Sequence, residues 1–329
     1  MSALRVIAPG MLTTVQDLGR WGFQSSGVSV AGPMDAYAHR LANALVGNAA
    51  EDATLEVTLT GPELECDDER VIAVSGAAFE ITADERPVPL DTAVELRPRS
   101  RLKFGRRLAG ARAYLGVAGG IDVPRVLGSR ATHLSSAIGG VEGRALRTGD
   151  ILPLGAACRD GRRGPAEQPP PLFRRSANAS GTGLDAGLPN GHARVRVLPG
   201  PHLESFAAGA LTMLQSSAYR IDPRSDRMGF RLEGARLART GDTEMISDAI
   251  AMGALQVPAS GHPILLMADR QTTGGYPIIA TVIAADLGLA GQLAPGDSIA
   301  FVVCSRAEAM AALIAREQRI LAATHAEWP

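Results

Sequence analysis

The segment at residues 156–192 constrains the fold of this chain more than any other feature. It contains Pro169-Pro170-Pro171 after a short basic run, followed by a stretch rich in serine, glycine and asparagine. Such a composition cannot bury enough apolar surface to order itself and is typical of an interdomain linker. We therefore predict domains at residues 1–155 and 193–305, a linker at 156–192, and a C-terminal helix at 306–329.

The sequence on both sides of this linker indicates short β-strands. Apolar or alternating runs are separated by turn residues, and the chain has 37 glycines and 21 prolines. This spacing favours barrels or sandwiches over a doubly wound sheet, so the predicted fold class is mainly β with few helices. The predicted strands lie at 71–82, 88–98, 111–118, 194–198, 262–268, 278–285 and 298–304.

Two helices are predicted from their capping signals. Asp35 can cap a helix over 37–45, and Gly47 follows as a stop. Ser305 and Glu308 form a capping box at the start of the C-terminal helix. The apolar residues on one side of that helix are Met310, Leu313, Ile314, Ile320 and Leu321.

Composition excludes several classes of function. The formal net charge of -1 gives no basic excess, so nucleic acid is not expected as a partner. No apolar run is long enough for a membrane span, and the first residues lack a signal-peptide pattern. The three cysteines read as reduced thiols of a cytoplasmic protein. Lys103, the only lysine, follows no glycine loop, which argues against a P-loop.

Polar, glycine-rich segments are the candidates for chemistry, and the clearest begins at Asp269. Arg270 offers a planar donor for a carboxylate or phosphate, and Gly274-Gly275 allows close backbone approach to a ligand. The remaining candidates in this segment are Gln271, Thr272, Thr273 and Tyr276. An elaborate turn whose side chains bond its own backbone is the alternative interpretation.

Three other segments have the same ambiguity. The run Ser225-Asp226-Arg227 could bind a ligand or form a surface ion pair at a turn. Ser129 and Arg130 could hold an anion or belong to an ordinary turn, and Asp17 and Arg20 stand in the first polar segment. The six histidines show no metal-ligand spacing, and neither a serine-hydrolase elbow nor a dinucleotide fingerprint is present. Residue chemistry alone therefore names no function.

Taken together, these segments resemble the biotin-dependent carboxyltransferase family with A and B subdomains, over about residues 5–303. The family includes the C subunit of 5-oxoprolinase, KipA-like proteins, allophanate hydrolase subunit 2 and part of urea carboxylase. The matching positions include Thr13 to Asp17, Gly19-Arg20, Gly27-Val28, Met34-Asp35, Leu55-Glu56, Tyr114, Leu127 to Arg130, Gly139-Gly140, Pro199-Gly200-Pro201, Ser225 to Gly229, Gln256-Val257-Pro258, Asp269 to Pro277 and Pro295-Gly296-Asp297.

The resemblance implies two β-barrel-like modules, at least one of them cyclophilin-like. It also implies partners, namely a 5-oxoprolinase B subunit or KipI-like chain, together with an A subunit. In the 5-oxoprolinase setting these subunits open 5-oxo-L-proline to L-glutamate with ATP and magnesium. In the urea setting, biotin on a separate carrier brings the carboxyl group. A third alternative is a non-catalytic, KipA-like regulatory binding protein. Departures from the family pattern at Ala131, His262 and Ile278 leave the substrate open.

We expect the C subunit of an ATP-dependent 5-oxoprolinase. In that hypothesis Arg227 and Arg270 hold an anion, while Asp226 and Asp269 transfer protons or position a metal–phosphate group. No metal ligand is expected from this chain itself. Ser129 and Arg130 would add a second anion contact.

A faint internal repeat links the two halves. The run Leu146 to Ile151 resembles Leu293 to Ile299, and each places Gly-Asp before a strand. Either the turn preference of Gly-Asp or two barrels of related design would explain it.

Overall fold

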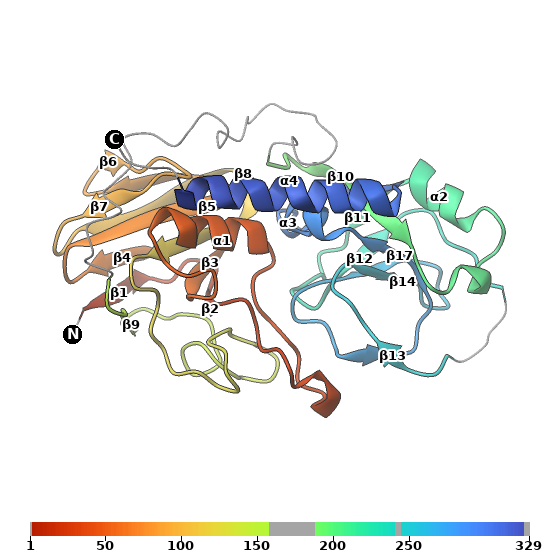
Figure 1. Ribbon diagram of the computed structural model, residues 1–329, viewed down its shortest axis with the longest axis horizontal. Helices are drawn as coiled ribbons and strands as arrows, with labels where there is room; N and C mark the ends of the chain where they lie inside the picture. Colours follow the sequence, from red (N-terminus) through yellow and green to blue (C-terminus); the bar gives the residue numbers. More distant parts are fainter. Residues whose placement is uncertain (1, 158–187, 241–244, 326–329) are drawn as a thin grey trace. The chain divides into compact units, whose positions relative to one another are not determined.

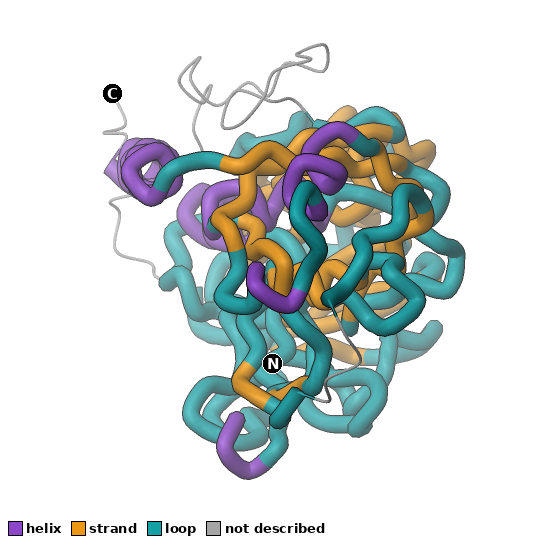
Figure 2. The backbone as a smooth tube through the Cα atoms, turned by 90° about the vertical axis from the view of Figure 1, so that its right-hand side faces the viewer, coloured by secondary structure: helices purple, strands orange, loops and turns teal. Residues whose placement is uncertain are grey.

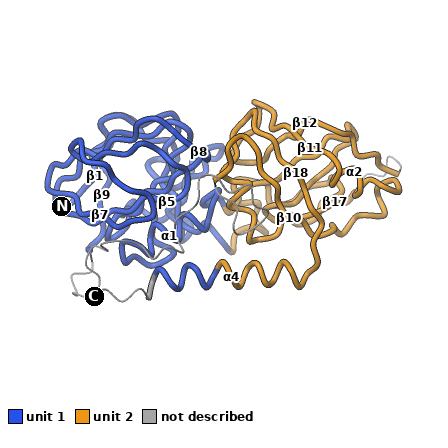
Figure 3. Tube along the Cα trace, turned by 90° about the horizontal axis from the view of Figure 1, so that it is seen from above, with its two compact units in different colours: residues 1–21, 31–177, 317–329 blue, residues 22–30, 178–316 orange. Residues whose placement is uncertain are grey.

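The computed structural model describes residues 2–157, 188–240 and 245–325, so most of the predicted linker lies outside the described residues (Figure 1). The chain divides into two compact units, coloured separately in Figure 3. Unit 1 comprises residues 1–21, 31–177 and 317–329, and unit 2 comprises residues 22–30 and 178–316. Each unit is thus assembled from segments that are far apart in the sequence. The short segment 22–30 belongs with the C-terminal half of the chain.

In unit 1, nine strands of the described chain form one sheet in the order β2-β3-β8-β4-β1-β9, with β5, β6 and β7 joined beyond β8. The strands are β1 Ala3–Ala8, β2 Leu12–Gln16, β3 Thr54–Thr58, β4 Glu63–Cys66, β5 Arg70–Ala83, β6 Arg86–Pro87, β7 Val94–Leu96, β8 Arg101–Val117 and β9 Ile151–Pro153.

The long strand β8 organises this sheet. Its first half pairs with β4 and its second half with β3, while β5 runs antiparallel along the opposite edge. The second half of β8 is buried throughout because the core lies on one face and helix α1 (Ala36–Leu45) packs on the other. Gly116 allows that approach, since a Cβ there would stand 2.7 Å from the carbonyl oxygen of Ala42.

Unit 2 contains a closed barrel with the strand order β10-β17-β14-β15-β12-β11-β18. The parallel pair of β10 and β18 closes it, with His192 opposite Ser298 and Val197 opposite Val303. Buried residues such as Val195, Phe230 and Phe301 fill its core. The strands are β10 His192–Pro199, β11 Ala218–Ile221, β12 Gly229–Glu233, β14 Ala254–Gln256, β15 Ile264–Leu266, β17 Ile278–Val282 and β18 Ser298–Val303; β13 Asp248–Ala249 pairs with β16 Thr273–Gly274 outside the barrel.

Both predicted caps are confirmed. The Asp35 carboxylate accepts hydrogen bonds from the backbone of Tyr37 and Ala38 at the start of α1. Ser305 and Glu308 bond reciprocally at the start of α4 (Arg306–His325). Ile320 of the apolar side of α4 is buried, whereas its Met310, Ile314 and Leu321 are about half exposed. The other α-helices in the described residues are α2 Ala210–Ser216 and α3 Leu287–Gly291.

The predicted fold class, mainly β with few helices, is confirmed, and strands and loops make up most of the chain in Figure 2. No helix among the described residues has the length and apolar character that a membrane crossing needs. Cys66 and Cys304 are free thiols, and Cys158 lies outside the described residues. A cyclophilin-like barrel stays a prediction.

Candidate functional site

Two of the predicted segments meet at one end of the unit 2 barrel. Strands β12 and β15 are antiparallel neighbours, with Gly229 opposite Leu266. The turn that enters β12 and the loop that leaves β15 therefore emerge side by side. Backbone bonds continue the pairing beyond the strands, since Asp269 N–H donates to the Arg227 carbonyl over 2.9 Å. The fold thus brings together side chains that are 42 residues apart in the sequence.

Arg227 and Asp269 form a buried, two-pronged ion pair. The Arg227 Nε and Nη2 atoms each lie 3.0 Å from a different oxygen of the Asp269 carboxylate. The two side chains are only 5% and 4% exposed. A buried bidentate pair holds both groups in fixed positions and neutralises both charges. Arg227 is therefore held in a fixed position by Asp269.

Arg270 is in a different situation. Its Nε donates to the Ile250 carbonyl at 3.0 Å and its Nη1 to the Met267 carbonyl at 3.4 Å. No carboxylate in the described part of the chain forms an ion pair with it, and its burial lowers the pKa of the guanidinium. A partly buried cation without a counter-anion is costly, and an anionic ligand would relieve that cost. Arg270 therefore has N–H groups and a charge left for a ligand.

The loop that follows Arg270 is closely packed against neighbouring residues. Gly274 belongs to the β13–β16 ribbon, where a Cβ would stand 2.4 Å from Ile250 Cδ1 and 2.7 Å from Gln256 Nε2. Any other residue at position 274 would displace these side chains. The Thr272 carbonyl accepts from Ile250 N–H, and Thr273 lies in β16. Gln271 is half-buried, a Cβ at Gly275 would stand 3.3 Å from the Met245 carbonyl oxygen, and Tyr276 is 48% exposed.

Ser225 and Asp226 serve the turn in which they occur. The exposed Asp226 carboxylate accepts from Met228 N–H at 2.8 Å, and Ser225 Oγ accepts from Arg231 N–H at 3.0 Å. These bonds shape the entry into β12. Asp226 as a proton-transfer group stays a prediction.

The candidates Asp17, Ser129 and Arg130 meet in unit 1 and form a single network. One oxygen of the Asp17 carboxylate accepts from Gly19 N–H at 2.9 Å and from Ser129 Oγ at 2.6 Å. The other oxygen accepts from Arg130 N–H. Three donors on one carboxylate join loops that lie more than a hundred residues apart in the sequence.

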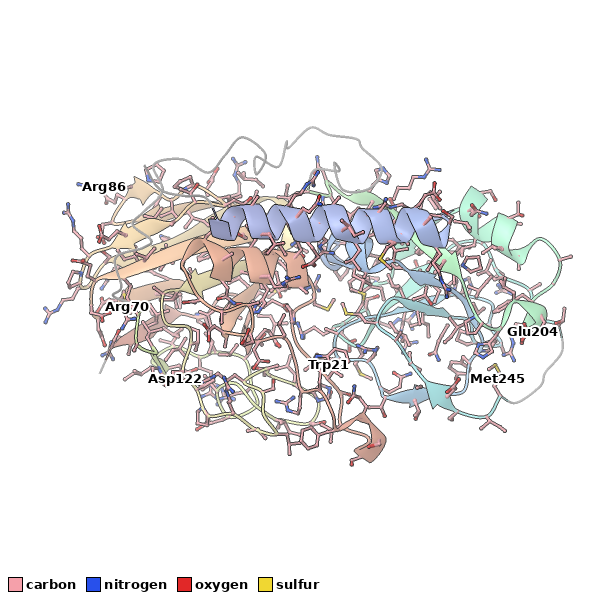
Figure 4. All side chains as sticks on the ribbon, viewed as in Figure 1. Trp21, Arg70, Arg86, Asp122, Glu204 and Met245 are labelled. Atoms are coloured by element: carbon pink, nitrogen blue, oxygen red, sulfur yellow. The ribbon has the colours of Figure 1, made fainter. Side chains whose placement is uncertain are left out.

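The two arginine candidates of unit 1, Arg20 and Arg130, are bound to protein groups. The Arg20 side chain is 1% exposed and donates to the carbonyls of Val126 and Ala131 over 3.0 and 2.8 Å. Arg130 donates to the Val123 carbonyl at 2.8 Å and forms an ion pair with Asp122, which is labelled in Figure 4. An anion that binds Arg130 would compete with Asp122, so anion binding here stays a prediction.

Sequence reasoning missed a buried polar network beside α1. Tyr114 donates to the Glu56 carboxylate at 2.7 Å and accepts from Asp35 N–H at 2.8 Å. Met34 N–H donates to the same Glu56 oxygen at 2.9 Å. Burial, and then the charges of Glu56 and Asp35, raise the pKa of Tyr114 well above its ordinary value. The matches Met34-Asp35, Leu55-Glu56 and Tyr114 were the only sequence signal for it.

His39 lies in the same region and is fully buried. Its Nε2 lies 3.0 Å from the Ala50 carbonyl and its Nδ1 2.9 Å from Thr54 Oγ1. A carbonyl only accepts, so Nε2 carries the proton and Nδ1 accepts from the threonine. Burial lowers the pKa of His39 from 6.5 to about 4, and the ring is neutral at pH 7.

Comparison with known proteins identifies the family. A family model described as the carboxyltransferase domain, subdomain A and B, matches residues 26–303. The chain belongs to this carboxyltransferase family. The carboxyltransferase chain is 42% identical to the C subunit of 5-oxoprolinase from Escherichia coli, over 94% of both chains. It is 37% identical to the C subunit from Haemophilus influenzae, over 90% of this chain and 89% of the other.

A solved structure agrees with this assignment. The urea carboxylase of Kluyveromyces lactis is similar with a TM-score of 0.84 and 31% identity, over 99% of this chain and 30% of that one. The predicted resemblance is thereby confirmed. In the part of this carboxyltransferase chain that is described, no three His, Cys, Asp or Glu residues are grouped so as to hold a metal ion.

Proposed function

We propose that this chain is the C subunit of an ATP-dependent 5-oxoprolinase. The observation that carries the proposal is the 42% identity to a subunit of that name over 94% of both chains. The similarity to the urea carboxylase structure is lower, at 31% identity. In this proposal the chain acts in a complex with an A and a B subunit, and it contributes to opening 5-oxo-L-proline to L-glutamate.

Arg270 is the proposed contact with substrate. The substrate carries a carboxylate, and Arg270 is a partly buried guanidinium without a carboxylate partner among the described residues. A carboxylate placed there would gain a charge-assisted hydrogen bond. The neighbouring Arg227–Asp269 pair keeps the two loops in register and does not need to touch the ligand. This differs from a clamp formed by both arginines.

ATP and magnesium belong to this proposal as cofactors of the whole complex. Lys103 lies in β8, opposite Glu63 and Thr82, and the described residues contain no group of three or more His, Cys, Asp or Glu that could hold a metal ion. The proposal therefore assigns no step with ATP to a residue of this chain.

Turnover by the reconstituted complex tests the proposal. The chain is mixed with its A and B partner subunits, ATP and 5-oxo-L-proline, and ADP and glutamate are measured. Formation of both products should require this chain and the substrate together. Arg270→Ala should abolish turnover, whereas Arg194→Ala, at an exposed position of β10, should leave it intact.

Two other assay results would assign a different function to the chain. Carboxylation of urea, with a biotin carboxylase and a biotinylated carrier present, would make the chain a urea carboxyltransferase component, as its similarity to urea carboxylase suggests. Tight binding to a B subunit or KipI-like chain, with no turnover of either substrate, would indicate a regulatory protein. An Arg270→Ala complex with full activity would contradict the anion contact while leaving the 5-oxoprolinase assignment standing.

A further inference from the structure

We propose that Ser29 is a positioning residue for Arg270. The proposal rests on the function proposed above, in which Arg270 binds the anionic part of the substrate. Ser29 comes from the N-terminal region of the sequence, more than two hundred residues before Arg270. Its hydroxyl donates to the backbone carbonyl of Arg270 over 2.9 Å.

The segment that carries Ser29 is part of unit 2. Residues 22–30 cluster with residues 178–316, although the chain before and after them belongs to unit 1. The segment has its own ordered turn, in which Gly27 N–H bonds to the Gln24 carbonyl at 2.9 Å and Val28 N–H to the Phe23 carbonyl at 3.2 Å. A turn held internally in this way presents the Ser29 hydroxyl in a defined direction.

The bond to Ser29 holds the backbone of Arg270, from whose Cα atom the side chain extends. On the amide side, Arg270 N–H has only a long bond of 3.3 Å to the Met267 carbonyl. On the carbonyl side, the bond to Ser29 is shorter and comes from a different segment of the chain. The guanidinium is oriented by a short hydrogen bond to the Ile250 carbonyl and a longer one to the Met267 carbonyl. A rotation of the peptide would therefore redirect the guanidinium.

Such a rotation weakens a ligand contact, because a binding group acts fully only in its productive geometry. A typical neutral hydrogen bond is worth about fivefold in an equilibrium constant. Loss of the Ser29 hydroxyl should therefore change the behaviour of Arg270 by about this factor, while the chain stays folded.

Chemical modification of the whole chain tests this contact without relying on catalysis. Phenylglyoxal reacts with arginine, and peptide mass spectrometry gives the rate at Arg270. In Ser29→Ala the rate should rise about fivefold, as expected when one typical hydrogen bond no longer holds the peptide. Ser29→Thr keeps the hydroxyl and should restore the slow rate. Ser26→Ala, at an exposed position in the same segment, is the matched control and should react like the wild type.

The kinetic arm uses the complex with its partner subunits. Ser29→Ala should raise KM for 5-oxo-L-proline several-fold with a smaller change in kcat, and Ser29→Thr should reverse this. An unchanged modification rate at Arg270 in Ser29→Ala would overturn the positioning role whatever the kinetics. A wild-type complex without turnover would instead refute the proposed function, and the modification rates would still decide whether Ser29 positions Arg270.

Discussion

The buried histidine of unit 1 predicts that this unit loses stability in mild acid. Burial lowers the pKa of His39 from 6.5 to about 4 in the folded chain. The unfolded chain therefore binds the proton first as the pH falls, and the folded state is destabilised between pH 6.5 and about 4. Over this window the difference reaches about 3 kcal/mol, and between pH 7 and pH 5 it is about 2 kcal/mol.

The charges that act on His39 support the direction of this effect. Desolvation is the largest contribution, and the nearby Asp17 and Glu56 charges oppose it only in part. Protonation would reverse the hydrogen bond to Thr54, with Nδ1–H donating and the hydroxyl accepting. The predicted loss of stability therefore comes from the buried charge.

Urea titrations at pH 7 and pH 5 measure the effect. Deuterium pulse labelling of peptides from β8 follows unit 1 specifically, because β8 lies in its core. The free energy of unfolding should fall by about 2 kcal/mol in the wild type. His39→Gln should remove most of this dependence, and His192→Gln, at an exposed position, should retain it. An equal fall in the free energy of unfolding between pH 7 and pH 5 in the wild type and in His39→Gln would refute the reasoning.

Three further substitutions test the packing described above. Asp269→Asn removes the buried ion pair with Arg227 and should cost about 3 to 5 kcal/mol in urea unfolding of unit 2; a loss below about 1 kcal/mol would contradict a strong contribution from this pair. Ser305→Ala should cost about 1 kcal/mol and speed hydrogen exchange in the first turn of α4, leaving β8 unaffected. Gly116→Ala places a Cβ against the Ala42 carbonyl and should cost about 1 to 3 kcal/mol in unit 1, with no change in unit 2.

Local signals in the sequence were sufficient to predict where two of the helices begin. The Asp35 cap and the Ser305–Glu308 capping box each bond to backbone or side chains no more than three residues away. Interactions of that range are encoded in a few adjacent residues and hold in almost any tertiary setting. The mainly β fold class followed in the same way from strand and turn residues, whereas the barrel-like modules were implied by the family resemblance.

The state of each arginine could not be predicted locally. From the sequence, Arg227 and Arg270 were the candidates for an anion clamp, and Arg130 was the candidate for a second anion contact. The structure pairs Arg227 with Asp269 and Arg130 with Asp122, while Arg270 has no ion pair in the described chain. Which cation has a counter-charge depends on tertiary neighbours that can be tens of residues away, and spacing in the sequence does not contain that information.

The assignment of residues 22–30 to unit 2 could not be predicted for a related reason. A division based on composition places one boundary at the proline-rich segment and treats everything before it as one domain. Segment 22–30 has no unusual composition, and its membership rests on contacts such as Ser29 with Arg270. Domain membership is a property of contacts, so a linear cut cannot recover it.

The two Gly-Asp turns of the internal repeat share their local geometry. In each turn the aspartate carboxylate accepts from the N–H three residues before it, at 2.7 Å for Asp150 and 2.8 Å for Asp297. The glycines at 149 and 296 both have a φ of 91°. Turn chemistry alone is sufficient to explain these internal features.

The two turns also form the same pair of hydrogen bonds with a neighbouring strand. Gly149 N–H donates to the Val6 carbonyl and Val6 N–H to the Asp150 carbonyl, over 2.8 and 2.9 Å. Ile221 makes the same pair of bonds with Gly296 and Asp297, over 2.8 Å each. A local turn preference does not specify which strand lies beside the turn or the register of that strand. Matching bonds to β1 in one unit and to β11 in the other therefore favour two modules of related design over a chance recurrence of Gly-Asp.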